Sequence, residues 1–546
     1  QQRDGYFGPS KDYPHERGIQ RDNSRDWWPK MVMLKVLKQY YSATGDQRVI
    51  QLMTNYFKYQ LNELPKSPLD HWTFWARYRG GDNLQVVYWL YNITGDKFLL
   101  ELGDLIHKQT FDYTNAFLNT DLLSRSGSIH CVNLAQGMKA PLVYYQHHPE
   151  PQYIAASNKG LADIRKYNGM AHGLYGGDEA LHGNNPTQGS ELCSAVEMMF
   201  SLESMLGITG NVAYADQLER IAFNALPAQV TDDFMGRQYF QQANQVMVTR
   251  QTRNFDQNHG GTDVCYGLLT GYPCCTSNMH QGWPKFTQNL WYATPDKGLA
   301  ALVYSPSEVT AFVGNGTQVT LKEETAYPFD ETVRFTFSSA DRNKTVAFPF
   351  HLRVPQWCKN PEVKINGETY QQVAGNSIVK IDRAWKTGDV VELQLPMQIF
   401  KNTWYENSVS VERGPLVYAL KIAEEWKNVK NEKDPIEYGD SYYEVLPTSP
   451  WNYGLIHVSV ENLEAAFTIT KKASVVDFPW NPENAPIALK TAARRIPSWG
   501  LYNGMTGPIP YSITNGLETE KQEEEIVLIP YGCTNLRISQ FPVIRK

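Results

Sequence analysis

One short junction occurs three times in the first half of the chain, as Thr44-Gly45-Asp46, Thr94-Gly95-Asp96 and Thr209-Gly210-Asn211. Each junction joins one helical pattern of apolar residues to another. Glycine can adopt the left-handed conformation that ends a helix. The Asp or Asn that follows can accept backbone N–H bonds at the start of the next helix. The repeat therefore predicts an array of helical hairpins over residues 1–300.

The spacing of these junctions favours a closed ring over an open solenoid. Solenoids keep a tight period, whereas the three glycines lie 50 and then 115 residues apart (95 − 45 and 210 − 95). A long intervening segment, residues 169–190, is rich in Gly, Asn and His, and polar loops at one end of a ring would build a pocket. We therefore predict that this region forms an (α/α)6 barrel, a toroid of six helical hairpins.

The hydrophobic pattern changes near residue 300. Residues 332–337 and 390–395 alternate between apolar and polar, and turn signals such as Asn366-Gly367 recur at short intervals. This pattern is typical of antiparallel β-structure. The predicted fold class is therefore multidomain α + β, with one or two antiparallel β-sandwich domains after the barrel. We place the domains at residues 1–300, 301–400 and 401–546.

Composition excludes several classes of protein. The 546 residues carry 51 Lys and Arg against 57 Asp and Glu, a net charge of −6, so a nucleic acid partner is not expected. The sequence has no run approaching about 18 apolar residues, so we expect no membrane span. The first residues show no signal pattern, and the sequence leaves open whether one has been removed.

The cysteines form the most unusual local feature. Seven are too few for a disulfide scaffold, but Cys274 and Cys275 are adjacent. Adjacent cysteines can be buried thiols, a strained vicinal disulfide or a pair of metal ligands. Glu191 and Cys193 can converge on one ion if they lie in an extended segment or at the entry to a helix. One oxygen and three sulfur donors favour Zn²⁺, while the alternative is three core cysteines and a surface glutamate.

Three further residues are candidates for the same pocket. Glu179 lies in the polar segment just before Glu191. A carboxylate beside a pocket can act as a general acid and base, or it can cap a helix. His130 and Tyr239 could contact a ligand, although from sequence alone a structural role is the more common one for a lone histidine in a helical pattern and for a tyrosine in an apolar segment.

These residues, in this order, resemble glycoside hydrolase family 127, the β-L-arabinofuranosidase family. In that family an (α/α)6 barrel carries β-sandwich domains, and one Glu and three Cys bind Zn²⁺. The resemblance implies the following roles: Zn²⁺ ligands Glu191, Cys193, Cys274 and Cys275; nucleophile Cys274; acid/base Glu179; and sugar-binding residues His130 and Tyr239.

The resemblance covers most of the chain, since residues 411–418 and 528–532 are similar to β-domain segments of the family. Family members often have prolines after the adjacent cysteines, whereas Thr276 and Ser277 follow here, which indicates a divergent branch. The implied function is an exo-acting retaining hydrolase that releases terminal β-L-arabinofuranose or a related sugar from plant cell-wall glycans such as pectin. That activity implies a periplasmic or secreted location.

Three alternatives remain at this stage. The same mechanism could act on another pectic sugar, for example aceric acid. Polysaccharide lyases also combine a helical toroid with β-sandwiches, and Tyr239 and His130 could serve such a reaction. The third alternative is a non-catalytic glycan-binding protein with a structural zinc ion.

Overall fold

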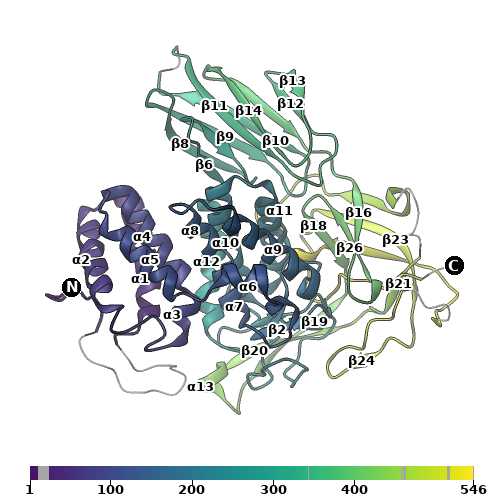
Figure 1. The fold of residues 1–546 in the computed structure, drawn as a ribbon. Helices are drawn as coiled ribbons and strands as arrows, with labels where there is room; N and C mark the ends of the chain where they lie inside the picture. The colour runs from purple at the N-terminus through teal and green to yellow at the C-terminus, as the bar shows by residue number, and fades with distance from the viewer. Residues whose placement is uncertain (10–23, 342, 457, 459–462, 513–516, 545–546) are drawn as a thin grey trace. The chain divides into compact units, whose positions relative to one another are not determined.

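The structure is a computed structural model that describes residues 1–9, 24–341, 343–456, 458, 463–512 and 517–544. The chain divides into two compact units, Gln1–Ile164 and Arg165–Lys546. Helices occupy the N-terminal part of the chain and β-strands dominate the C-terminal part, as the colour gradient in Figure 1 shows.

The first unit is built from helices. Their bounds are α1 (Trp27–Thr44), α2 (Gln47–Glu63), α3 (Phe74–Tyr78), α4 (Gly80–Thr94), α5 (Phe98–Gln109), α6 (Tyr113–Asn119), α7 (Cys131–Gly137), α8 (Ala140–Tyr145) and α9 (Pro151–Asn168), of which α9 continues into the second unit. Two of the predicted junctions join α1 to α2 and α4 to α5. The third joins α10 (Leu192–Thr209) to α11 (Val212–Arg220) in the second unit.

The glycine of each junction ends a helix as predicted. Gly45, Gly95 and Gly210 have φ angles of 68°, 74° and 67°, in the left-handed region that favours glycine. The predicted caps are confirmed at Asp46 and Asn211, whose side chains accept the amide two residues further on. The prediction is wrong at Asp96, because α5 begins later, after Lys97, and has no side-chain cap.

Helix α10 forms the centre of the helical part of the second unit. By length and hydropathy it alone among the described helices could cross a membrane, but 72% of its 18-residue window is buried inside the protein. It packs against α11 and α12 (Cys274–Gln288) and carries the buried carboxylates of Glu197 and Glu203. These features are typical of a core helix.

A small sheet beside α10 positions the candidate site. Its strand order is β2-β1-β3-β4, and the strands span Ala180–Gly183, Gly176–Asp178, Ser190–Glu191 and Phe240–Gln241. Strand β1 pairs with β2 in antiparallel fashion and with β3 in parallel, while β4 pairs with β3. The sheet therefore brings together segments from three parts of the sequence.

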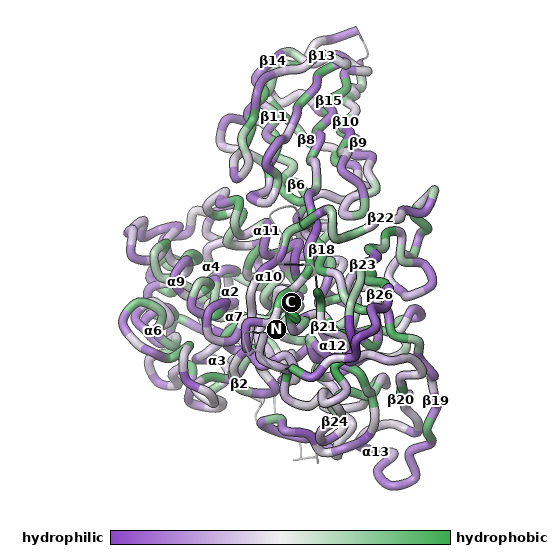
Figure 2. Tube along the Cα trace, turned by 90° about the vertical axis from the view of Figure 1, so that its right-hand side faces the viewer, coloured by the Kyte–Doolittle hydropathy of each residue, from purple (hydrophilic) through white to green (hydrophobic). Residues whose placement is uncertain are grey.

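The middle of the chain forms two sheets that share a core. One has the order β13-β12-β15-β10-β9-β8 and the other β14-β11-β7-β6. Their bounds are β6 (Trp291–Ala293), β7 (Leu299–Ala301), β8 (Ser307–Val313), β9 (Thr317–Thr325), β10 (Thr332–Ser339), β11 (Val346–Val354), β12 (Glu362–Ile365), β13 (Glu368–Gln372), β14 (Ser377–Trp385) and β15 (Val390–Gln394). The Phe335 ring of β10 lies 5.2 Å from the Phe350 ring of β11. Hydrophobic and hydrophilic positions alternate over short intervals along these strands (Figure 2).

The C-terminal part forms a seven-stranded sheet, ordered β16-β17-β18-β26-β23-β21 with β22 paired to β23. These strands are β16 (Ile399–Thr403), β17 (Val409–Arg413), β18 (Leu416–Leu420), β21 (Tyr453–Leu455), β22 (Thr468–Lys471), β23 (Ile487–Arg495) and β26 (Glu524–Pro530). Shorter pieces are β5 (Asn244–Gln245), β19 (Glu424–Lys430), α13 (Pro435–Tyr438), β20 (Ser441–Pro447), β24 (Leu501–Tyr502), β25 (Met505–Thr506) and β27 (Arg537–Ile538).

A buried ion pair ties this sheet to the helices. The Arg220 guanidinium of α11 donates to both oxygens of Glu412 in β17, at 2.6 and 2.7 Å. The predicted fold class, a helical region built from hairpins and followed by antiparallel β-domains, is confirmed. The domain limits at residues 300 and 400 stay predictions.

Candidate active site

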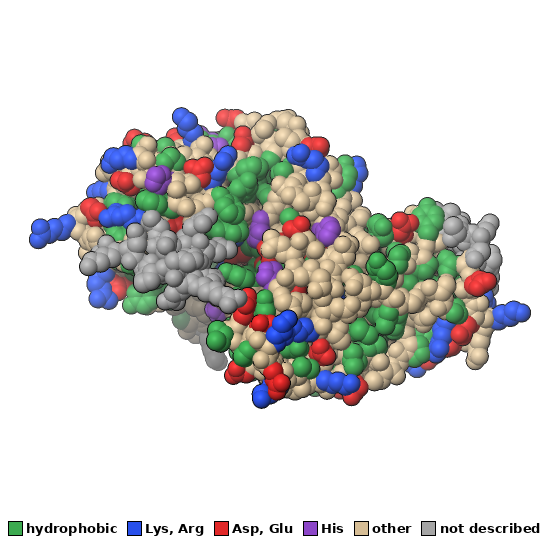
Figure 3. Space-filling model, turned by 90° about the horizontal axis from the view of Figure 1, so that it is seen from below, with side chains coloured by type: hydrophobic (Ala, Val, Ile, Leu, Met, Phe, Trp, Pro, Cys, Tyr) green, Lys and Arg blue, Asp and Glu red, His purple; other side chains and the backbone are tan. Residues whose placement is uncertain are grey.

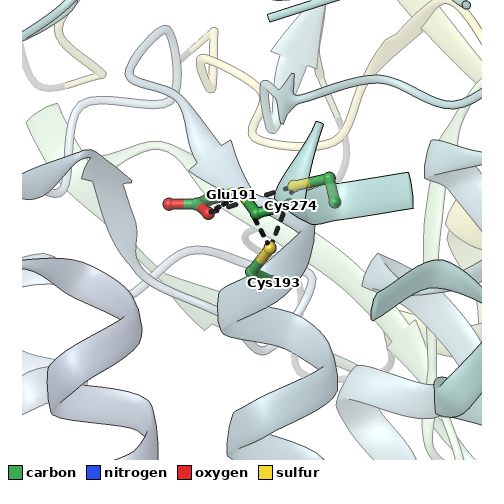
Figure 4. A group of neighbouring side chains, drawn as sticks. Glu191, Cys193 and Cys274 are labelled. Carbon is green, nitrogen blue, oxygen red and sulfur yellow. Dashed lines mark hydrogen bonds between the residues drawn. The ribbon is translucent and has the colours of Figure 1, made fainter. Parts of the chain in front are cut away.

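The four predicted metal ligands come from two helix starts. Glu191 ends β3 and is the N-cap of α10, with extended dihedral angles (φ −74°, ψ 137°), while Cys193 lies in the first turn of that helix. Cys274 and Cys275 open helix α12. Figure 4 shows Glu191, Cys193 and Cys274 pointing toward one another from these elements. The helix entry after Glu191 is the geometry that lets residues two apart in sequence converge.

The donor atoms lie close enough together to share one metal ion. The Cys193 Sγ atom lies 3.4 Å from that of Cys274 and 3.2 Å from that of Cys275. Glu191 Oε1 lies 3.8 and 3.9 Å from the same two sulfur atoms. Zn²⁺ binds thiolates at about 2.3 Å in a tetrahedron, which separates the sulfurs by about 3.8 Å. One oxygen and three sulfur donors in this arrangement can therefore hold a metal ion.

The three thiols of this cluster differ in exposure and in proton affinity. All are free cysteines; Cys193 and Cys275 are buried and Cys274 is partly exposed. Hydrogen bonds from Cys193 and Cys275 lower the pKa of Cys274, whereas burial raises the pKa of the other two thiols. The start of α12 also favours a thiolate. Cys274 is therefore the thiol that best carries negative charge and also reaches the surface of the site.

A buried arginine fixes the segment that leads to Cys274. The Arg237 guanidinium donates to the backbone oxygens of Thr270, Leu268 and Tyr272 and to the Thr276 hydroxyl, with distances of 3.0 Å to Leu268 and Tyr272 and 3.2 Å to Thr276. This side chain is completely buried. It therefore holds the chain on both sides of the adjacent cysteines.

Glu179 lies at the turn between β1 and β2. Its φ angle of 87° is in the left-handed region, which costs a non-glycine residue about 1–3 kcal/mol. The Tyr239 hydroxyl hydrogen-bonds to Glu179 Oε1, and burial raises the pKa of that tyrosine well above its usual range. The structure thus brings two of the predicted site residues, Glu179 and Tyr239, into direct contact.

Asp178 anchors the turn that carries Glu179. Its buried carboxylate accepts the backbone N–H groups of Asp256 at 2.9 Å and Gly189 at 3.3 Å. It also contacts His182 Nδ1 at 2.8 and 3.0 Å through its two oxygens. Burial raises the pKa of Asp178, and the hydrogen bond to Asp178 raises the pKa of His182. Sequence analysis did not identify this role, because a single aspartate beside a glutamate carries no such signal.

His259 is the second residue that sequence analysis did not identify. Its Nε2 atom lies 3.5 Å from Glu179 Oε1, and its Nδ1 atom lies 2.7 Å from Asp263 Oδ1. Burial alone would lower the pKa of His259, but the hydrogen bond to Asp263 and the charges of Asp263 and Glu179 raise it. The spacing of His259 and Asp263 is the only sequence signal that could have pointed to this pair.

His130 belongs to the first unit. It is the N-cap of α7, where its Nδ1 atom accepts the Asn133 amide at 3.3 Å. Its ring stands edge-on to Trp75, with centroids 5.1 Å apart. The predicted contact between His130 and a sugar stays a prediction.

Charges of both signs are interspersed on the face of the protein shown in Figure 3. Among the described residues of that face no continuous basic stripe appears, in agreement with the net charge of −6.

Two family models match the chain. The model described as "Beta-L-arabinofuranosidase, GH127 catalytic domain" matches residues 1–288, and the model of the GH127 middle domain matches residues 298–397. A curated relative, the non-reducing end β-L-arabinofuranosidase of Bifidobacterium longum subsp. longum, is 26% identical over 246 residues. That match covers 43% of this chain and 36% of the relative, so the matched region is about a third of the relative's length.

Solved structures of the same family share the fold. A GH127 β-L-arabinofuranosidase from Geobacillus stearothermophilus T6 has a TM-score of 0.69 at 19% identity, covering 100% of this chain and 84% of that one. A second GH127 β-arabinofuranosidase has a TM-score of 0.66 at 18% identity, covering 100% and 82%. The catalytic-domain match alone spans 288 of the 546 residues, more than half. The chain therefore belongs to the GH127 β-L-arabinofuranosidase family of glycoside hydrolases.

Proposed function

We propose that this protein is an exo-acting, retaining glycoside hydrolase that releases terminal β-L-arabinofuranose, or a related sugar, from plant cell-wall glycans. The observation that carries the proposal is the convergence of Glu191, Cys193, Cys274 and Cys275 within 4.8 Å of one another, next to a carboxylate held by Tyr239. The name of the curated relative supports the sugar and its terminal position.

We assign the four converging residues to Zn²⁺. The donor set, three sulfurs and one oxygen, is the kind that zinc prefers. A bound Zn²⁺ would keep the coordinated thiols deprotonated at neutral pH. Because the protein would supply four donors, no ligand position would remain for water, and a side chain rather than a metal-bound hydroxide would serve as the nucleophile.

Cys274 is the proposed nucleophile and Glu179 the proposed acid and base. In the first step the Cys274 sulfur forms a bond to the anomeric carbon, and the bond to the leaving oxygen breaks as Glu179 gives that oxygen its proton. In the second step Glu179 takes a proton from water, whose oxygen replaces the sulfur at the same carbon. Two displacements at one carbon retain its configuration.

Tyr239 and His130 are proposed to bind the sugar hydroxyls. The Tyr239 hydroxyl already contacts Glu179, so it can orient the carboxyl group and a sugar hydroxyl together. We also propose a periplasmic or secreted location, because polymeric plant glycans are met outside the cytoplasm.

The test combines metal analysis with a substrate panel. We expect about one zinc per chain in protein purified under reducing conditions without chelator, and less in Cys193→Ser and Cys274→Ser. Cys358→Ser is the matched control, because Cys358 is as buried as Cys193 and hydrogen-bonds to the backbone oxygen of Pro396 in the middle domain. The panel contains 4-nitrophenyl β-L-arabinofuranoside, its α-anomer and other pectic glycosides, with the product anomer followed by NMR.

Three results would overturn the proposal. Metal-free wild-type protein would leave the four residues as core groups. An unsaturated, ultraviolet-absorbing product would identify a lyase. Ligand binding that survives in Cys274→Ser, with no turnover by the wild type on any glycan, would identify a binding protein. If the protein hydrolyses only another pectic glycoside, the proposed sugar is wrong but the proposed mechanism stands.

A further inference from the structure

We propose that His259, held by Asp263, is a positioning residue that fixes the carboxyl group of Glu179 for proton transfer. The inference rests on the acid/base role proposed above for Glu179. It adds two residues, His259 and Asp263, that neither the motifs nor the metal cluster include.

The geometry places His259 and Tyr239 on the same oxygen of Glu179. The Tyr239 hydroxyl hydrogen-bonds to Oε1, and His259 Nε2 lies 3.5 Å from that atom. Two partners on one oxygen restrict where that oxygen can lie. Because the Glu179 backbone is in the left-handed region, the turn also presents the side chain in a restricted direction.

Asp263 organises both partners of Glu179. Its side chain accepts the His259 backbone N–H at 3.1 Å through each oxygen and contacts His259 Nδ1 at 2.7 Å. Its backbone oxygen accepts the N–H groups of Tyr239 at 3.0 Å and Phe240 at 2.9 Å. Asp263 is 1% exposed, so these bonds are shielded from water. One buried residue therefore sets the positions of the imidazole and of the tyrosine.

Aromatic rings confine the imidazole itself. The ring centroid of His259 lies 5.0 Å from Tyr239, 6.4 Å from Phe240 and 6.0 Å from Tyr272. The Tyr239 and Phe240 contacts are edge-to-face. Rotation of the imidazole would break these contacts and the bond to Asp263. The ring is thus held with Nε2 toward Glu179.

The hydrogen-bond pattern gives the imidazole a defined tautomer. Asp263 accepts from Nδ1, so Nδ1 carries a proton and Nε2 is the nitrogen that faces Glu179. Protonated Nε2 can donate a hydrogen bond to Glu179 Oε1, so the proton that Glu179 gives to the leaving oxygen is carried by the other carboxyl oxygen, Oε2. The same bond from Nε2 can therefore hold Oε1 both before that proton is transferred and afterwards.

Two substitutions of one residue separate this role from loop stability. In His259→Asn the amide nitrogen can replace Nδ1 and keep the bond to Asp263, but it does not extend to Glu179. In His259→Gln the longer side chain can place its amide nitrogen where Nε2 lies. Zinc content and thermal unfolding of both variants report whether the loop remains intact.

The experiment measures kcat/KM, which reports the first displacement, on methyl and 4-nitrophenyl β-L-arabinofuranosides. A methoxide leaving group needs protonation, whereas nitrophenolate needs little. General acids contribute about 10²–10⁴-fold, and we expect His259→Asn to lose about 10–100-fold on the methyl glycoside and less than about 5-fold on the nitrophenyl glycoside. His259→Gln should recover most of that loss. Zinc content should not change in either variant.

Glu179→Gln, assayed in parallel, distinguishes the acid/base role of Glu179 from the positioning role of His259. If Glu179→Gln impairs the methyl glycoside but His259→Asn matches the wild type, the positioning role is wrong and the acid/base role stands. Equal losses on both glycosides, with lower zinc or stability, would also refute positioning and leave only a structural role. If Glu179→Gln hydrolyses both glycosides like the wild type, the acid/base proposal itself fails, and the inference fails with it.

Discussion

The Asp178→Asn substitution tests how firmly the turn that carries Glu179 is anchored. The Asp178 carboxylate accepts two backbone N–H groups, from Asp256 at 2.9 Å and Gly189 at 3.3 Å, and it contacts His182. Asparagine keeps the size of the side chain but has only one acceptor oxygen. In either orientation of the amide, its NH₂ group faces one of the two backbone donors.

The expected effect follows from that one conflict. A buried donor without a partner costs about 1–3 kcal/mol, which corresponds to a factor of about 5–150 in local opening. The neutral amide also weakens the bond to His182. We therefore expect the amides of Gly189 and Asp256 to exchange hydrogen about 5–150-fold faster, measured by mass spectrometry on peptides from residues 176–190 and 253–260. Because Glu179 lies in the loosened turn, kcat should fall as well.

Asp256→Asn is the matched control. Its side chain is exposed, and its contact with Asp178 uses the backbone N–H, which the substitution does not alter. Exchange and kcat should therefore stay close to the wild type. The reasoning is refuted if Asp178→Asn exchanges like the wild type at both peptides, because the carboxylate would then not hold the turn.

Three further predictions concern stability and packing. Glu412→Gln should destabilise the protein by about 3–5 kcal/mol at neutral pH, because it leaves the buried charge of Arg220 without its partner. Despite burial, Arg220 holds the pKa of Glu412 below its usual range. The difference in stability between wild type and variant, measured by thermal unfolding, should therefore shrink as the pH falls through that pKa. Burial raises the pKa of Glu203 from 4.5 to about 8, so the wild type must bind a proton on folding between these two pH values. Glu203→Gln should remove a destabilisation that grows by about 2–4 kcal/mol between pH 5 and 8, and equal melting shifts at both pH values would contradict this. Gly271→Ala should reduce kcat/KM and zinc content, because Gly271 has a φ of 63° and an added Cβ would lie 2.2 Å from Tyr239 Cβ. Gly183→Ala is the control: Gly183 also has a positive φ, 84°, but an added Cβ meets open space, so this variant should keep the zinc.

The sequence was most informative where chemistry is concentrated in few residues. The adjacency of Cys274 and Cys275 is rare enough to indicate a site, and the Glu-x-Cys pair supplies the remaining donors. A glycine followed by Asp or Asn likewise predicts a helix junction, because few residues adopt its left-handed conformation. The error at Asp96 has a local cause: α5 begins at Phe98, two residues after Asp96, so Lys97 takes the cap position.

The support of Glu179 could not be predicted from sequence, because it depends on contacts between distant segments. Asp263 and Glu179 are 84 residues apart (263 − 179), and His259 connects them only through the folded loop. Each of these residues, taken alone, is of a type that is common in polar loops. Pairing of β1, β3 and β4 is what brings the segments together, and two- or three-residue strands leave no hydrophobic pattern.

The loop that carries His259 is also held by contacts with the C-terminal part of the chain, beyond residue 397, where the matched family models end. The loop that carries His259 begins near Arg250, which donates to Asn431 and Asp434 at 2.9 Å each. Backbone bridges join Val248 to Val445 on the flanking strand β20. Residues 1–397 would therefore contain every proposed ligand and catalytic residue, yet they would lack the groups that hold this loop. The proposed active site therefore depends on the helical region, which carries the proposed ligands and catalytic residues, and on the C-terminal β-structure, which holds the loop of His259.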